Sequence, residues 1–142
     1  MTKQTASKKN ISVVAVDESE LLLAYQRQVD TDILNANIES VNSCVSSQAR
    51  FEQAINLLCN QNSDFTVKAL TYKSKQRNLL YKNQKVLYFT ANFVNVTKTI
   101  ADKKNVEIMS VKKYNHAYCY NVAVEQYKSY AEIKNLIERI AE

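Results

Sequence analysis

The stretch of residues 85–112 constrains the fold most, because its hydrophobic pattern changes from strand to helix and back. Val86–Phe89 is an unbroken apolar run, which is typical of a strand covered on both faces. From Phe93 the apolar residues recur at helical spacing, and Val106–Val111 is again extended in pattern. A connection of about a dozen residues suits a crossover between parallel strands. The sequence therefore predicts a β-α-β unit, with a single long strand from Val86 to Ile100 as the alternative.

Helical patterns flank this unit on both sides. The first half predicts three helical segments, with polar residues near 30–37 weakening or breaking the first. The last segment begins with a Ser129/Glu132 capping box and continues with an apolar stripe, which predicts a C-terminal amphipathic helix. Further strands are expected at residues 11–16, 65–72 and 116–124.

These elements predict an α/β or α+β fold with a helical first half, the central β-α-β crossover and a C-terminal amphipathic helix. We expect a mixed sheet of about four to five strands. Residues 1–10 are polar and predict a flexible arm, and residues 11–142 predict a single domain.

The chain contains no glycine, no proline and a single histidine. The lack of glycine excludes the usual P-loop, dinucleotide fingerprint and hydrolase nucleophile elbow. One histidine excludes a His-based zinc cluster, and Cys44, Cys59 and Cys119 are too widely spaced to suggest a CxxC pair. We interpret the three cysteines as reduced, buried thiols. No cofactor is expected from the motifs in this sequence.

Charge is unevenly distributed along the chain. Residues 1–71 carry six Lys/Arg and eight Asp/Glu, whereas residues 72–142 carry thirteen and six. The second half is therefore about +7 at neutral pH, which favours an acidic partner such as nucleic acid. Tyrosines are interleaved with these cations, and aromatic rings stack on bases where cations neutralise phosphates. The alternative for most of the tyrosines is packing in the core or at a sheet edge. The expected nucleic-acid-binding residues are Lys73, Lys75, Arg77, Lys82, Lys85, Lys112, Lys113 and Tyr114.

Two segments carry a family resemblance. RFEQAINLLCN resembles the opening helix of restriction-endonuclease-like domains of the Mrr type, and VLYFTANFVNVTKTIADKKNVEIM is similar to their later crossover. The resemblance implies a divalent-metal site, normally Mg²⁺, in which Glu52 and Asp64 are the acids and Lys68 orients water. Thr66 stands where these nucleases have a second acidic or amide ligand, so the implied site is degenerate. The alternative is that the three residues are ordinary surface charges.

Asp30 and Asp32 are a weaker candidate for a cation site, with a cap or turn role as the alternative. His116 is a weaker candidate for an acid–base group, with a structural role as the alternative. The function expected first is a small non-enzymatic protein that binds DNA or RNA through its basic Tyr/Lys-rich second half. The alternatives are a protein-interaction or assembly module, oligomeric or bound to a host factor, and a divergent metal-dependent nuclease. The abundance of Asn, Lys, Tyr and Ile is typical of AT-rich genomes, so we expect a phage or viral source and the host cytoplasm as the location. No apolar run approaches the length of a membrane span, so no membrane partner is expected.

Overall fold

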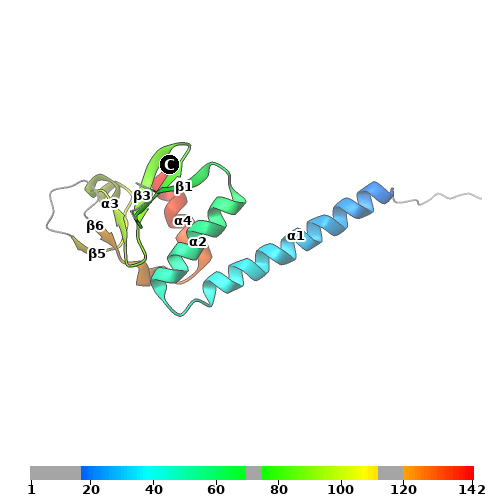
Figure 1. Cartoon of the computed structure of the whole chain (residues 1–142), viewed down its shortest axis with the longest axis horizontal. Helices are drawn as coiled ribbons and strands as arrows, with labels where there is room; N and C mark the ends of the chain where they lie inside the picture. Colours follow the sequence, from blue (N-terminus) through cyan, green and yellow to red (C-terminus); the bar gives the residue numbers. More distant parts are fainter. Residues whose placement is uncertain (1–16, 70–74, 112–119) are drawn as a thin grey trace, which may run out of the picture. The chain divides into compact units, whose positions relative to one another are not determined.

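The computed structural model describes residues 17–69, 75–111 and 120–142 (Figure 1). The chain divides into two compact units, Met1–Ala36 and Asn37–Glu142. The arm expected at residues 1–10 and the strand expected at 11–16 lie outside the described residues.

Helix α1 runs without interruption from Glu18 to Asn42 and contributes to both units. The predicted break near residues 30–37 is wrong. The acidic side chains there do not compete with the helix for backbone groups, because each accepts a hydrogen bond from a glutamine one turn earlier. These bonds join Gln26 Nε2 to Asp30 Oδ1 and Gln28 Nε2 to Asp32 Oδ1, each at 2.9 Å.

Two further helices, α2 (Ser47–Gln61) and α4 (Tyr130–Ala141), supply much of the core of the second unit. Both start at a serine N-cap whose hydroxyl accepts a first-turn N–H, from Ser46 to Ala49 and from Ser129 to Glu132. The helices predicted at these positions are confirmed. Their fully buried side chains are Phe51, Ile55, Leu58, Ile133, Leu136 and Ile137.

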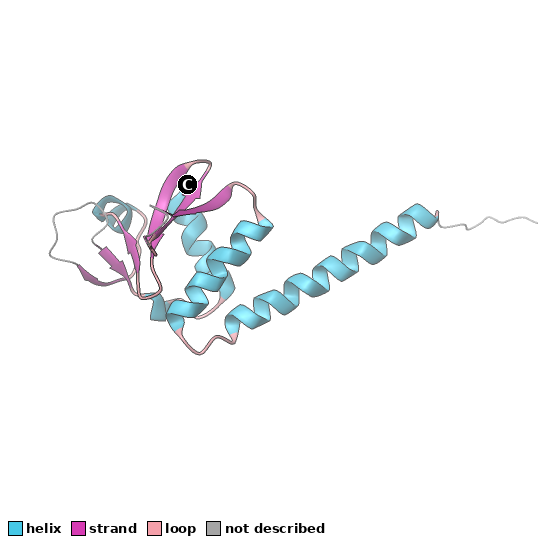
Figure 2. Ribbon diagram, viewed as in Figure 1, coloured by secondary structure: helices cyan, strands magenta, loops and turns pink. Residues whose placement is uncertain are grey.

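In the described residues six strands form one sheet in the order β1-β2-β3-β4-β6-β5, and every neighbouring pair is antiparallel. Figure 2 shows the strands in magenta. The mixed α/β class is confirmed, but the sheet has more strands than expected and is antiparallel, not mixed. The strands are β1 (Phe65–Ala69), β2 (Arg77–Tyr81), β3 (Gln84–Phe89), β4 (Val94–Val96), β5 (Ile108–Val111) and β6 (Tyr120–Val122). A short 3-10 helix, η2 (Val124–Gln126), precedes α4.

The register separates the sheet into two faces, because residues directly opposite in an antiparallel pair point the same way. Leu79 lies opposite Leu87, and Phe89 lies opposite Val94; all four are buried. Helix α2 contacts β1 and helix α4 contacts β3. The opposite face carries a polar row across five neighbouring strands: Lys68, Asn78, Tyr88, Asn95 and Asn121.

The predicted crossover is present, but its first strand is β4, not β3. Strands β4 and β5 are parallel because each is antiparallel to β6, which lies between them. Helix α3 (Lys98–Lys103) connects them and starts at Thr97, whose Oγ1 accepts the N–H of Ile100 at 3.1 Å. The expected start near Phe93 and the alternative of one long strand are both wrong. Residues 94–96 are extended because two β-branched valines favour a buried strand.

Turns are made without glycine. Lys82 and Asn83 both have positive φ, 50° and 68°, and form the two-residue turn between β2 and β3. Two-residue hairpins favour this conformation because its twist matches that of the strands. Asn105 has φ 55° just after α3, the left-handed conformation that commonly follows the end of a helix. Lys82 in this turn and Lys85 in β3 are both exposed, and they line a hollow that residues of α4 also line.

Candidate functional site

The basic residues expected to bind nucleic acid divide into two groups along β2. Lys75 is exposed just before the strand, and Arg77 is its half-buried first residue. Lys82 and Lys85 are exposed at the β2–β3 turn. A strand advances about 3.3 Å per residue, so roughly 17 Å separates Arg77 from Lys82. The remaining predicted residues, Lys73, Lys112, Lys113 and Tyr114, lie outside the described residues.

A shorter segment of the chain has a stronger imbalance of charge than the second half as a whole. Residues 65–101 carry seven Lys/Arg and no Asp or Glu. This segment supplies β1, β2, β3 and β4, which are neighbours in the sheet. Comparing the two halves of the sequence missed this boundary, although a count of carboxylates in a sliding window would have found it.

None of the described lysines of this segment forms an ion pair with a carboxylate. Within residues 17–69, 75–111 and 120–142, the one ion pair joins Lys134 to Glu138 in α4, at 3.0 Å. The Lys82 ammonium lies 5.3 Å from the ring centroid of Tyr81, a cation–π contact worth roughly 0.5–1 kcal/mol at an exposed site. The turn therefore presents positive charge beside an aromatic ring.

A hollow of about 470 Å³ borders this turn. Apolar side chains of β3, α3 and α4 line it, together with Lys82 of the β2–β3 turn and Lys85 of β3. One carboxylate, Glu142, also borders it. The lining residues are Tyr81, Lys82, Gln84, Lys85, Val86, Ile100, Ile140, Ala141 and Glu142. Such a combination suits a flat, apolar group that carries negative charge at its edge.

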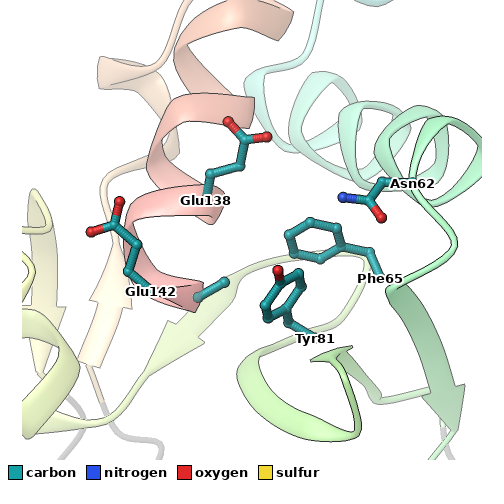
Figure 3. A pocket seen from close by; sticks show the side chains of 6 residues that line it. Asn62, Phe65, Tyr81, Glu138 and Glu142 are labelled. Carbon is teal, nitrogen blue, oxygen red and sulfur yellow. The ribbon is translucent and has the colours of Figure 1, made fainter.

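A second hollow of about 320 Å³ also borders Tyr81 (Figure 3). Phe65 and Tyr81 pack at one wall, with ring centroids 4.7 Å apart and planes tilted by 44°. Glu138 and Glu142 come from α4 on the opposite wall, and Asn62 comes from the end of α2. The two carboxylates make this side unfavourable for phosphate, so the hollow bordered by Lys82 and Lys85 is the better candidate for an anionic ligand.

The tyrosines serve different purposes. Tyr127 and Tyr130 are buried, and the Tyr127 ring packs edge-on against Phe51 with centroids 6.3 Å apart. Tyr81 and Tyr88 are half-buried on opposite faces of the sheet. Among the described tyrosines, Tyr127 and Tyr130 pack in the core, which is part of the alternative of core or sheet-edge packing, and Tyr81 lines the hollow bordered by Lys82 and Lys85.

The nuclease residues occupy separate elements. Glu52 is half-buried in α2, Asp64 is exposed in the loop before β1, and Lys68 is exposed on β1. Within the described part of the chain, no three His, Cys, Asp or Glu side chains gather as a metal site would require. The nuclease and its Mg²⁺ requirement stay predictions, as does the Mrr-type resemblance.

The other candidate groups do not form a catalytic set in the described residues. Cys44 and Cys59 are half-buried free thiols, and burial raises the pKa of the Cys59 thiol. A raised pKa lowers the thiolate fraction at neutral pH, which makes Cys59 a poor nucleophile. Cys119 and His116 lie outside the described residues.

No family model, curated protein or solved structure matches this chain. None of the helices built from described residues has the length and apolar character that crossing a bilayer requires.

Proposed function

We propose that this protein binds single-stranded nucleic acid at the basic hollow formed by the β2–β3 turn, α3 and α4. The observation that carries the proposal is that two exposed lysines and apolar side chains of β3, α3 and α4 line the same hollow. A nucleobase is flat and apolar on its faces, and it is joined to an anionic backbone. The hollow matches both properties.

Binding divides into two contributions. The Lys82 and Lys85 ammonium groups neutralise phosphates and release counterions, which makes binding salt-dependent. The half-buried side chains of Ile100 and Tyr81 contact the base, since Val86 and Ile140 are buried in the core. A base in a duplex is stacked and paired, so it cannot enter a hollow of this kind without unstacking. Single strands are therefore the favoured ligand.

The carboxylate-free strands extend the positive surface away from the hollow. Lys75 and Arg77 lie at the far end of β2, roughly 17 Å from the turn, a span of about two to three nucleotides of an extended strand. This second group contacts further phosphates without reading their sequence. The affinity for nucleic acid should therefore depend on phosphate charge and on whether the nucleic acid is single-stranded, and little on the identity of the bases.

The test is fluorescence anisotropy at low salt, with a labelled single strand of deoxythymidine, the matching uridine strand and a duplex. The double variant Lys82→Gln/Lys85→Gln should weaken single-strand binding about tenfold. The matched control is Lys103→Gln/Lys128→Gln, which removes the same charge from two exposed lysines outside the site. Equal weakening by both variants, or no binding at low salt, would refute the proposed site.

A further inference from the structure

The described chain exposes eight large hydrophobic side chains, and five of them lie on α1. Those five are Leu21, Leu22, Leu23, Tyr25 and Ile33, each 55–70% exposed. Monomeric proteins seldom leave such a concentration of large apolar groups on one helix uncovered. A helix of this length also gains most of its stability from packing an apolar face, and residues 30–35 contain weak helix formers.

Three of these five side chains, Leu22, Tyr25 and Ile33, lie on one face of the helix, together with half-buried Val29 and exposed Ala36. Leu22, Tyr25, Val29, Ile33 and Ala36 follow one another at intervals of three or four residues. At about 100° per residue these positions form a single stripe roughly 21 Å long. Leu23 is as exposed as Ile33, 55% each, but it lies about 80° beyond Ile33, outside the stripe.

We infer that this stripe pairs with the same stripe of a second copy, with the two helices antiparallel and crossing at Val29. In this arrangement Leu22 lies opposite Ala36 and Tyr25 lies opposite Ile33, so each larger side chain meets a smaller one. The same surface serves both copies, as in most homodimers with two-fold symmetry. The inference is independent of the proposed nucleic-acid site.

Avoidance of like-charge contacts selects the antiparallel orientation. Residues 17–36 carry five carboxylates and one arginine, so a second copy must avoid like-charge contacts. Antiparallel pairing places Asp32 near Gln28 of the second copy and Asp30 near Gln26, because residues on the same flank of the stripe then face each other. Parallel pairing in register brings Asp32 of each copy beside Asp30 of the other. Gln26 and Gln28 each donate to one of these aspartates within a single helix, and each amide has a second N–H to donate.

The test of the stripe is sedimentation of the full chain over a concentration series. An interface this short is at the small end for specific complexes, so we expect a reversible dimer with Kd in the micromolar range. Ile33→Gln should weaken the dimer about tenfold or more, whereas Leu23→Gln should change Kd by less than about threefold. Glutamine is a better helix former than isoleucine, so lost helix in the monomer cannot explain the difference; circular dichroism checks this. A chain that is monomeric at about 200 μM, or equal weakening by both variants, overturns the inference.

Orientation has its own test. In a chain with the three native cysteines replaced by serine, Val29→Cys should form a disulfide-linked dimer under mild oxidation. Leu22→Cys should not, because antiparallel pairing separates the two copies of position 22 by roughly 21 Å. Equal cross-linking at both positions overturns the antiparallel arrangement. Added salt should tighten the pairing of two acidic helices; weakening would instead indicate that α1 docks on a basic surface, which contradicts the inference.

Discussion

Replacing Asn95 with valine should raise the free energy of unfolding, because the asparagine amide is buried and has no hydrogen-bond partner among the described residues. Asn95 is the middle residue of β4, is 0% exposed and lies opposite Tyr88 and Asn121 in the polar row of the sheet. Neither its side-chain nitrogen nor its side-chain oxygen has a partner in the described part of the chain. A buried asparagine side chain can make up to four hydrogen bonds, so the desolvation of this amide is uncompensated.

The size of the effect follows from two opposing contributions. Removing an unsatisfied buried polar group regains about 1–3 kcal/mol, and valine suits a central strand better than asparagine. The shorter side chain leaves some unfilled volume, which subtracts part of this gain. We therefore expect a net stabilisation of about 1–2 kcal/mol, which corresponds to roughly 3–10 °C in Tm for a unit of this size. Asn95→Ala removes the same amide but leaves a larger hole, so it should be nearly neutral.

Both variants are measured by urea unfolding followed by circular dichroism, with binding of single-stranded nucleic acid as a second readout. Asn95→Val should shift the unfolding midpoint upward with an unchanged m-value, and it should not alter nucleic-acid affinity because Asn95 is inaccessible. A loss of more than about 1 kcal/mol would refute the reasoning, since it would mean that the amide has a partner in solution.

Two further predictions concern α4. Ser129→Ala should lower the free energy of unfolding by about 1 kcal/mol, because it removes the hydroxyl that accepts the Glu132 N–H at 3.3 Å; Ser129→Asp, which keeps a cap, is the control in the same urea assay. Burial, followed by the charges of Glu138 and Cys59, raises the pKa of Tyr130, so the folded state holds its phenolic proton more tightly than the unfolded state. This contribution to stability is complete below pH about 10 and is lost as the pH rises further, so wild-type stability should fall more steeply above that pH than the stability of Tyr130→Phe. Parallel pH curves for the two chains would contradict it.

Local patterns predicted the helices better than the strands. Helix α4 was predicted correctly because its serine cap and apolar stripe lie within one short segment. Strand β4 was missed because three residues carry too little pattern, and their burial depends on β3 and β6 on either side. The continuity of α1 was missed because its glutamine–aspartate pairs offset the usual tendency of aspartate to interrupt a helix.

The candidate site was predictable only in part. Lys82 and Lys85 were identified from the basic character of the second half of the chain, and the structure places both beside one hollow. The apolar lining of this hollow could not be foreseen, because Ile100 and Ile140 come from helices far away in the sequence. Charged residues can be counted from the sequence, whereas the hollow beside these lysines depends on how the helices and strands pack together.

The salt dependence of single-strand binding tests most directly whether the basic hollow and its strands hold a nucleic-acid backbone. If the turn and the far end of β2 together contact about three to four phosphates, log K should fall with log salt with a slope of about −2 to −3. The double variant Lys82→Gln/Lys85→Gln should reduce the magnitude of that slope by about 1.4, and Lys103→Gln/Lys128→Gln should leave it unchanged. An affinity that does not change with salt, or a slope unaffected by loss of the two turn lysines, would contradict binding at this site.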